Sequence, residues 1–125
     1  MVIDSNLLQE IAKRCHMANK VWCELNGDFS QIDWDELDLQ TKESVLEGVL
    51  FVLDRYPDIK AEDLHINWLN KKISSGWEYG PIKDEDAKQH PSMVDYFLLS
   101  ETDKIKDLIF LCTALTYLQI KNPLG

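Results

Sequence analysis

The stretch HINWLNKKISSGWEYGPIKD, residues 65–84 of the 125-residue chain, decides the local fold. Its first half has the apolar period of an amphipathic helix, which we expect to stop at Gly76. An aromatic turn follows and is closed by Gly80-Pro81. Tryptophan, tyrosine and lysine side chains are more frequent here than a helix end requires. The stretch therefore predicts either a surface for a flat, anionic partner or a rigid corner that holds the fold.

Apolar residues at helical spacing continue on both sides of this stretch, and no segment alternates with period two, so no sheet is predicted. Ser5 or Asn6 is expected to cap the first helix, and Gly48 within the second predicts close approach of a neighbouring helix. The chain is thus predicted to be a single all-α domain, residues 1–125, forming a compact bundle of four main helices plus a short helical turn. The expected helices span about 6–25, 39–55, 61 to the stop at Gly76, and 100–121, with the short turn at 85–89.

The composition is that of an ordinary soluble globular protein, with 45% hydrophobic and 28% charged residues. A formal net charge of −9 repels nucleic acid polymers and anionic membranes, so we expect neither as a partner. The N-terminus has no signal-peptide pattern, and no apolar run approaches the roughly 20 residues that cross a bilayer. Cys15, Cys23 and Cys112 suit reduced thiols better than a disulfide framework, which predicts a cytoplasmic protein.

The sequence carries no pattern of catalytic or metal-ligating residues. His16, His65 and His90 fall in three different elements, and none has a second ligand three or four residues later. Hydrolase, Walker-type and His-Glu-x-x-His motifs are missing. We therefore expect a binding protein with no catalytic residue, no metal and no cofactor, and not an enzyme.

The aromatic and basic residues of the central stretch suit a binding function. Trp68 and Lys72 are four residues apart on one helix face, and Trp77 and Tyr79 form an extended pair whose side chains share a face. An indole beside ammonium groups suits a purine base and its phosphates. The alternative is that the tryptophans fill the core and the lysines only face solvent; the residue pattern leaves this choice open. Further lysines follow in the same region at Lys71, Lys83 and Lys88.

A second group of candidates lies on the first helix and in the loop that follows it. His16 and Asn19 share a helix face, where a histidine most simply has a structural role. Asp28 and Gln31 are loop residues with polar edges, and Trp34 stands among acidic residues. Trp34 is expected either to fold back into the core or to act as a lid over a ligand.

The central stretch also resembles a known module. The resemblance is carried by His65-x-x-Trp68, Gly76-Trp77-x-Tyr79-Gly80-Pro81-x-Lys83-Asp84 and Lys88-x-His90-Pro91. Upstream matches are Cys15-His16-x-Ala18-Asn19-x-x-Trp22, Gly27-Asp28-x-Ser30-Gln31-x-x-Trp34 and Ser44-x-x-x-Gly48-Val49. Together these residues closely resemble the RyR domain, the repeat module of ryanodine receptors, and most of all its stand-alone bacterial and phage versions. Met17 and Ser92 depart from positions where the prokaryotic members commonly carry glutamate and cysteine.

The resemblance implies a small helical fold without catalysis. In the channel, two repeats face each other, and an adenine nucleotide stacks between tryptophans at the position that matches Trp68. A chain with one copy of the motif rebuilds such a two-sided site only by pairing with itself, so a homodimer is expected. The prokaryotic versions occur in genetic settings of defence against phage, which suggests a sensor or a sponge for a nucleotide signal.

Two functions follow as hypotheses. The first is a non-enzymatic module that binds a small nucleotide-like ligand, either an adenine nucleotide or a nucleotide-derived signal. The second is a protein–protein interaction module with no small-molecule ligand. Within the first, we favour Trp68 as the ligand contact and Trp77 as the anchor of the turn. The predicted site comprises the stacking residues Trp68, Trp77 and Tyr79, the phosphate-binding Lys71, Lys72, Lys83 and Lys88, and the polar or lid residues His16, Asn19, Asp28, Gln31 and Trp34.

Overall fold

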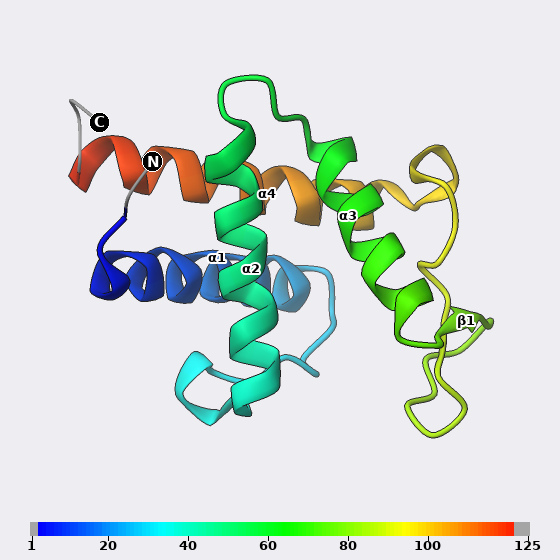
Figure 1. Ribbon diagram of the computed structural model, residues 1–125. Coiled ribbons are helices and arrows are strands. Elements are labelled where there is room, and N and C mark those ends of the chain that lie inside the picture. The colour runs from blue at the N-terminus through cyan, green and yellow to red at the C-terminus, as the bar shows by residue number, and fades with distance from the viewer. Residues whose placement is uncertain (1–2, 122–125) are drawn as a thin grey trace.

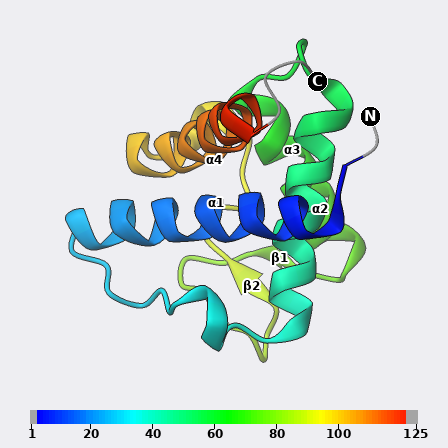
Figure 2. The same ribbon diagram turned by 90° about the vertical axis from the view of Figure 1, so that its left-hand side faces the viewer.

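The computed structural model describes residues 3–121 and consists mainly of helices packed together (Figure 1). The four α-helices are α1 (Ser5–Leu25), α2 (Leu39–Arg55), α3 (Ala61–Ser74) and α4 (Glu101–Lys121). The predicted all-α bundle is therefore confirmed, and the predicted bounds of the second helix agree with those of α2. α1 and α4 pack against each other and run in opposite directions in both views (Figure 1, Figure 2).

α1, α2 and α4 each begin where a polar side chain accepts hydrogen bonds from the first backbone N–H groups. At α1 the capping residue is Asp4, whose Oδ1 lies 2.6 Å from the N of Asn6. The prediction of Ser5 or Asn6 as the cap was wrong by one or two positions, because all three residue types cap well and sequence alone does not rank them. At α4 the Oγ of Ser100 accepts from the N of Asp103 at 3.1 Å and caps the helix.

The hydrophobic core lies where α1, α2 and α4 meet, and α3 adds its buried edge. Trp34, only 5% exposed, belongs to this core and enters it from a short 3-10 helix, η1 (Trp34–Glu36). Gly48 of α2 confirms the predicted close approach, because a Cβ at this position would lie 3.1 Å from the ring of Phe110 in α4. The main buried residues of the core are Ile11, Ala12, Cys15, Val49, Val52, Leu53, Leu64, Leu111 and Ala114.

The connection from α3 to α4 differs from the prediction. It contains a two-stranded parallel pair, β1 (Glu78–Tyr79) and β2 (Gln89–His90), in which the N of Glu78 donates to the O of Lys88 at 2.9 Å. Strands of two residues are too short to produce a period-two pattern, so the sequence carries no sign of them. The predicted short helix at 85–89 is instead a turn, closed by an antiparallel bridge between Asp84 and Gln89. A second 3-10 helix, η2 (Tyr96–Leu98), leads into α4.

Within residues 3–121, no helix has the length and apolar character that crossing a bilayer requires.

The contact at Gly48 yields a stability prediction. Gly48→Leu should lower the free energy of unfolding by about 1–3 kcal/mol, because the new side chain would meet the ring of Phe110. Chemical denaturation measures this value. Glu43→Leu, on the exposed side of the same helix, should change the free energy by less than about 0.5 kcal/mol. In a double-mutant cycle with Phe110→Ala the two effects should be less than additive; simple additivity would contradict the contact.

Candidate functional site

A pocket of about 210 Å³, the Trp68 pocket, lies where α3, β2 and the first turns of α4 meet. One wall is aromatic and comes from α3 and β2. The charged part of the lining, here called the charged wall, comes from α4. The lining residues are His65, Trp68, His90, Ser92, Leu99, Asp103, Lys106 and Asp107.

The aromatic wall is held in place by a buried histidine. His65 is 4% exposed, and its Nε2 donates to the carbonyl O of Val94 at 2.6 Å. Its ring stacks on the indole of Trp68, one helical turn away, with 5.7 Å between ring centroids and 26° between planes. The imidazole of His90 meets the same indole edge-on at 5.0 Å. Trp68, itself half-buried, is therefore fixed on two sides.

His90 is positioned by β2, and β2 depends on a glycine in the segment beside it. A Cβ on Gly80 would lie 2.6 Å from the Cβ of Gln89, so a larger residue would push the two segments apart. The Nδ1 of His90 accepts from the N of Ser92 at 3.0 Å, which requires that nitrogen to be unprotonated. Burial, and then the charges of Lys83 and Lys72, lower the pKa of His90 below its ordinary value. His90 is therefore mainly neutral near pH 7.

A partly desolvated cation lies beside the aromatic wall. The Nζ of Lys72 is 4.1 Å from the ring centroid of Trp77 and 5.9 Å from that of Trp68. Burial, and then the charge of Lys83, lower the pKa of Lys72. No carboxylate in residues 3–121 forms an ion pair with Lys72. Its charge is therefore available to an anionic group.

The charged wall holds two carboxylates in different states. Asp103 is engaged, because its Oδ2 accepts from the Oγ of Ser92 at 3.2 Å and its Oδ1 lies 3.3 Å from the Nζ of Lys106. Asp107, one turn further along α4, has no hydrogen bond or ion pair to any described residue. Burial, and then the charge of Asp103, raise the pKa of Asp107 to about 7. Near neutral pH, Asp107 is thus an unengaged carboxyl group that exists in both protonation states.

The structure brings some of the predicted residues of the central stretch together and separates others. Trp77 is half-buried and its ring lies 6.5 Å from that of His90, while Lys83 is close enough to lower the pKa of two neighbours. Lys88 donates from Nζ to the O of Ser75 at 3.1 Å and so ties the turn to the end of α3. Tyr79 is 56% exposed and lies outside the pocket lining.

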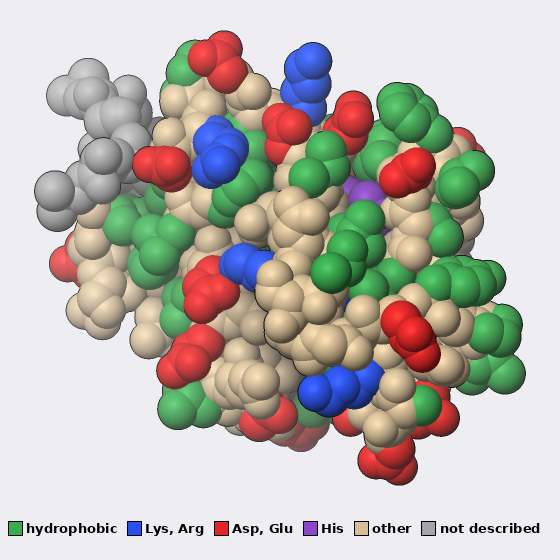
Figure 3. Space-filling view, turned by 45° about the vertical axis from the view of Figure 1, so that its right-hand side comes forward, with side chains coloured by type: hydrophobic (Ala, Val, Ile, Leu, Met, Phe, Trp, Pro, Cys, Tyr) green, Lys and Arg blue, Asp and Glu red, His purple; other side chains and the backbone are tan. Residues whose placement is uncertain are grey.

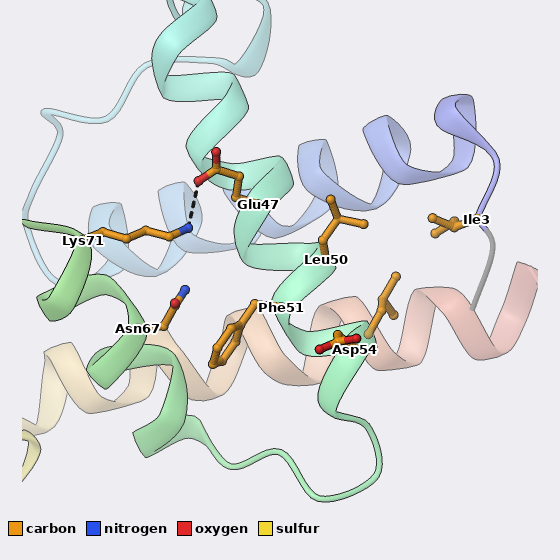
Figure 4. A pocket seen from close by; sticks show the side chains of 8 residues that line it. Ile3, Glu47, Leu50, Phe51, Asp54, Asn67 and Lys71 are labelled. Atoms are coloured by element: carbon orange, nitrogen blue, oxygen red, sulfur yellow. Dashed lines mark hydrogen bonds and ion pairs between the residues drawn. The ribbon is translucent and has the colours of Figure 1, made fainter. Parts of the chain in front are cut away.

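Lys71 lies on another side of α3, in a second pocket of about 390 Å³ between α2 and α3. Its Nζ is 2.8 Å from the Oε2 of Glu47, as the dashed line in Figure 4 marks. Asn67 and Phe51 also line this second pocket (Figure 4). The sequence grouped Lys71 with Lys72, but adjacent residues of a helix point in different directions.

The predicted residues of α1 and its following loop are not part of the Trp68 pocket lining. His16 donates from Nε2 to the O of Ile32 at 2.6 Å, and its ring lies 6.1 Å from that of the buried Trp34. Gln31 is exposed, and the Oδ1 of Asn19 is buried without a hydrogen-bond partner among the described residues. Asp28 accepts from the Oγ of Ser30 at 2.6 Å.

Asp28 nevertheless has an electrostatic link to the charged wall. Its pKa is lowered first by the hydrogen bonds from Ser30 and also by the charge of Lys106. The loop after α1 is thus within electrostatic reach of the pocket, although Asp28 does not line it.

Sequence reasoning missed the charged wall and the supporting histidines. Lys106 and Asp107 follow Asp103 by three and four residues, the spacings that place each of them beside Asp103 on the helix surface, and this was the available signal. His65 was recognised only as part of a motif, although its spacing of three from Trp68 allows the two rings to stack. Among residues 3–121, no group of three or more His, Cys, Asp or Glu side chains is arranged to hold a metal ion.

The family model described as RyR domain matches residues 51–122, more than half of the chain. The matched region contains α3, the β1–β2 pair and α4, and thus every residue that lines the Trp68 pocket.

The raised pKa of Asp107 leads to a prediction about stability and pH. The pKa rises from 3.8 to about 7 on folding, so folding favours the protonated form, and stability is lost as pH increases between these two values. Asp107→Asn removes the buried charge. The variant and the wild type should be about equally stable at pH 4, and the variant should be more stable by about 1–3 kcal/mol at pH 8. Thermal and urea denaturation at the two pH values measure the difference, and an equal difference at both would refute it.

Proposed function

Because the chain belongs to the RyR domain family, we propose that it is a non-enzymatic module that binds a small nucleotide-like ligand in the Trp68 pocket. One observation carries the proposal: the half-buried indole of Trp68 lines a pocket, and the Nζ of Lys72, free of any ion pair in the described chain, lies 5.9 Å from that ring. An aromatic face stacks a base, and an ammonium group attracts phosphate.

The distribution of charge favours one orientation of the ligand. On the charged wall, the ion pair with Lys106 offsets the charge of Asp103. The carboxylate form of Asp107 would repel a phosphate, but its oxygens can accept from the N–H groups of a base or the hydroxyls of a ribose. Lys72 and Lys83 lie on the side of Trp77 and β2 and would attract the phosphate. The base would therefore enter the pocket and the phosphate would stay outside it.

The size of the pocket agrees with partial insertion. Its volume of about 210 Å³ is below the roughly 300–1,000 Å³ of pockets that enclose drug-sized ligands. One ring system would fit inside, and the rest of a nucleotide would lie across the surface. A second copy of the chain could cover that exposed part, which is why the proposal includes a homodimer.

The surface near the pocket supports such an assembly. Figure 3 shows hydrophobic side chains gathered on the face that α3, the β1 turn and η2 present. Phe97 and Leu98 on η2 are 75% and 73% exposed, and exposed apolar clusters mark interaction surfaces. The other exposed apolar residues of these elements are Ile66, Ile73, Tyr79 and Ile82.

The biological part of the proposal follows from the family resemblance. We place the chain among the stand-alone bacterial or phage members of the family, in a cytoplasmic setting, as a sensor or sponge for a nucleotide signal in phage–host conflict. The exposed apolar surface also favours the second candidate, a protein–protein interaction module without a small-molecule ligand.

The stacking role of Trp68 can be tested directly. The purified protein is denatured and the extract is examined for an ultraviolet-absorbing nucleotide, and calorimetry then measures the affinity for ATP, ADP-ribose and cyclic nucleotides. Trp68→Leu should weaken binding by roughly tenfold or more, because a stacked base contributes about 1–3 kcal/mol. Trp68→Phe should retain most of the affinity because it keeps an aromatic face.

Phe29→Leu serves as the matched control, since Phe29 is 74% exposed and belongs to the loop after α1. Circular dichroism confirms that each variant is folded. If no nucleotide co-purifies and none of the panel binds, the nucleotide proposal fails. A stable protein complex recovered under the same conditions would then support the second candidate.

The homodimer is tested by size-exclusion chromatography with light scattering. The double variant Phe97→Ser and Leu98→Ser should shift the equilibrium toward monomer, because it removes two of the most exposed apolar side chains. Phe29→Ser removes an equally exposed aromatic ring elsewhere and should leave the equilibrium unchanged. A wild-type protein that stays monomeric at the highest concentration reached would exclude the homodimer.

A further inference from the structure

We propose that Asp107 reads the base bound in the Trp68 pocket and that its protonation state sets which base is preferred. As a carboxylate it would favour guanine, and as a carboxylic acid it would favour adenine. This inference rests on the proposed function, because it assigns a role to one residue of the same site.

The geometry singles out Asp107 within the pocket. It lines the same pocket of about 210 Å³ as Trp68, so a base held there against the indole would lie beside the carboxyl group of Asp107. Asp103, the other carboxylate of this wall, is already engaged by Ser92 and Lys106. Asp107 has no such partner in the described chain, and both of its oxygens are free to bind a ligand.

The chemistry of the two protonation states differs in a way that matches two bases. An ionised carboxylate only accepts hydrogen bonds. Guanine presents two adjacent donors, N1–H and the 2-amino group, and so pairs with a carboxylate through two bonds. A protonated carboxyl group donates one bond and accepts another. Adenine presents a donor beside an acceptor, its 6-amino group next to N1 or N7, and so pairs with the acid form.

The surroundings of Asp107 place the change of state near neutral pH. On its own helix, the negative charge of Asp103 opposes ionisation and the positive charge of Lys106 favours it, while burial raises the pKa to about 7. From β2, His90 lines the pocket and is mainly neutral, because burial and then the charges of Lys83 and Lys72 lower its pKa.

The other titratable groups around the pocket are already engaged. From α3, His65 lines the pocket with one ring nitrogen bonded to the O of Val94. From the loop after α1, Asp28 does not line the pocket; the charge of Lys106 contributes to lowering its pKa, after the hydrogen bonds from Ser30. Asp107 is therefore the pocket group that combines a free hydrogen-bonding edge with a change of charge near pH 7.

The test compares cyclic AMP and cyclic GMP, whose phosphodiester keeps one negative charge over the whole range. Calorimetry at pH 5.5 and pH 8 gives the ratio of the two dissociation constants. For the wild type the ratio should move by roughly tenfold or more toward cyclic GMP as pH rises, since a bidentate base contact contributes about 1–3 kcal/mol of discrimination. Effects of pH on groups that contact only the shared ribose and phosphate cancel in the ratio, whereas an effect of His90 on the base would persist in Asp107→Asn.

Two variants make the test specific. Asp107→Asn offers one donor and one acceptor at every pH, so it should prefer cyclic AMP at both pH values. Asp95→Asn, an exposed residue outside the pocket lining, should behave as the wild type. Because asparagine is nearly isosteric with aspartic acid, Asp107→Asn should fold, and circular dichroism checks this.

The outcomes separate this inference from the proposed function. A ratio that does not change with pH, or one that changes equally in Asp107→Asn, overturns the role of Asp107. If Trp68→Leu still weakens binding by roughly tenfold or more in that case, the nucleotide site stands without a role for Asp107. Failure of both cyclic nucleotides to bind at either pH also overturns the inference, while ATP and ADP-ribose continue to test the proposed function independently.

Discussion

The hydrogen bond from His65 to the carbonyl of Val94 is the constraint on which the site depends. It joins residues 29 positions apart and ties the connection between α3 and α4 back onto the bundle. A buried imidazole without a hydrogen-bond partner would be costly. His65 can therefore be buried only if the chain places the carbonyl of Val94 within its reach. The stacked rings of His65 and Trp68 then fix one wall, and the returning chain delivers His90 against the edge of the same indole.

The second principle of the site is separation of charge. Lys72 lies over the aromatic rings on the side of Trp77 and β2. On α4, Lys106 of the pocket lining is paired with Asp103, which leaves Asp107 as the acidic group without an ionic partner in the described chain. A ligand with an anionic part and a hydrogen-bond-donating part would be oriented by this arrangement without any contact specific to its identity. The net charge of −9 strengthens the same selection, because a polyanion is repelled over long range while one small anion reaches a local lysine within a Debye length.

The helices could be predicted well from the sequence, and the site only in part. Apolar spacing and caps are local signals, which is why the bounds of α2 and the approach of a neighbour to Gly48 were correct. Trp68 and Lys72 were identified because they share one helix face. Asp107 was missed, because its proximity to Trp68 arises only when α3 packs on α4. The β1–β2 pair escaped prediction for a similar reason: it is created by two non-adjacent dipeptides and by the absence of a side chain at Gly80.

The link between α3 and α4, residues 75–100, has little regular structure, yet it supplies three lining residues of the pocket, His90, Ser92 and Leu99. Individual side chains anchor it to the helices: the His65–Val94 and Ser92–Asp103 bonds, the contacts of His90 with Trp68 and of Trp77 with Lys72, and the buried side chains of Met93 and Leu99. Such a segment can open as a cooperative unit at a lower free energy than the bundle itself. The pocket exists only in molecules whose 75–100 segment is packed on the helices. The apparent affinity for any ligand is therefore scaled by the fraction of molecules in that state. A bound ligand in turn protects the backbone amides of this segment from hydrogen exchange. Ligand affinity and amide protection therefore report on the same opening equilibrium.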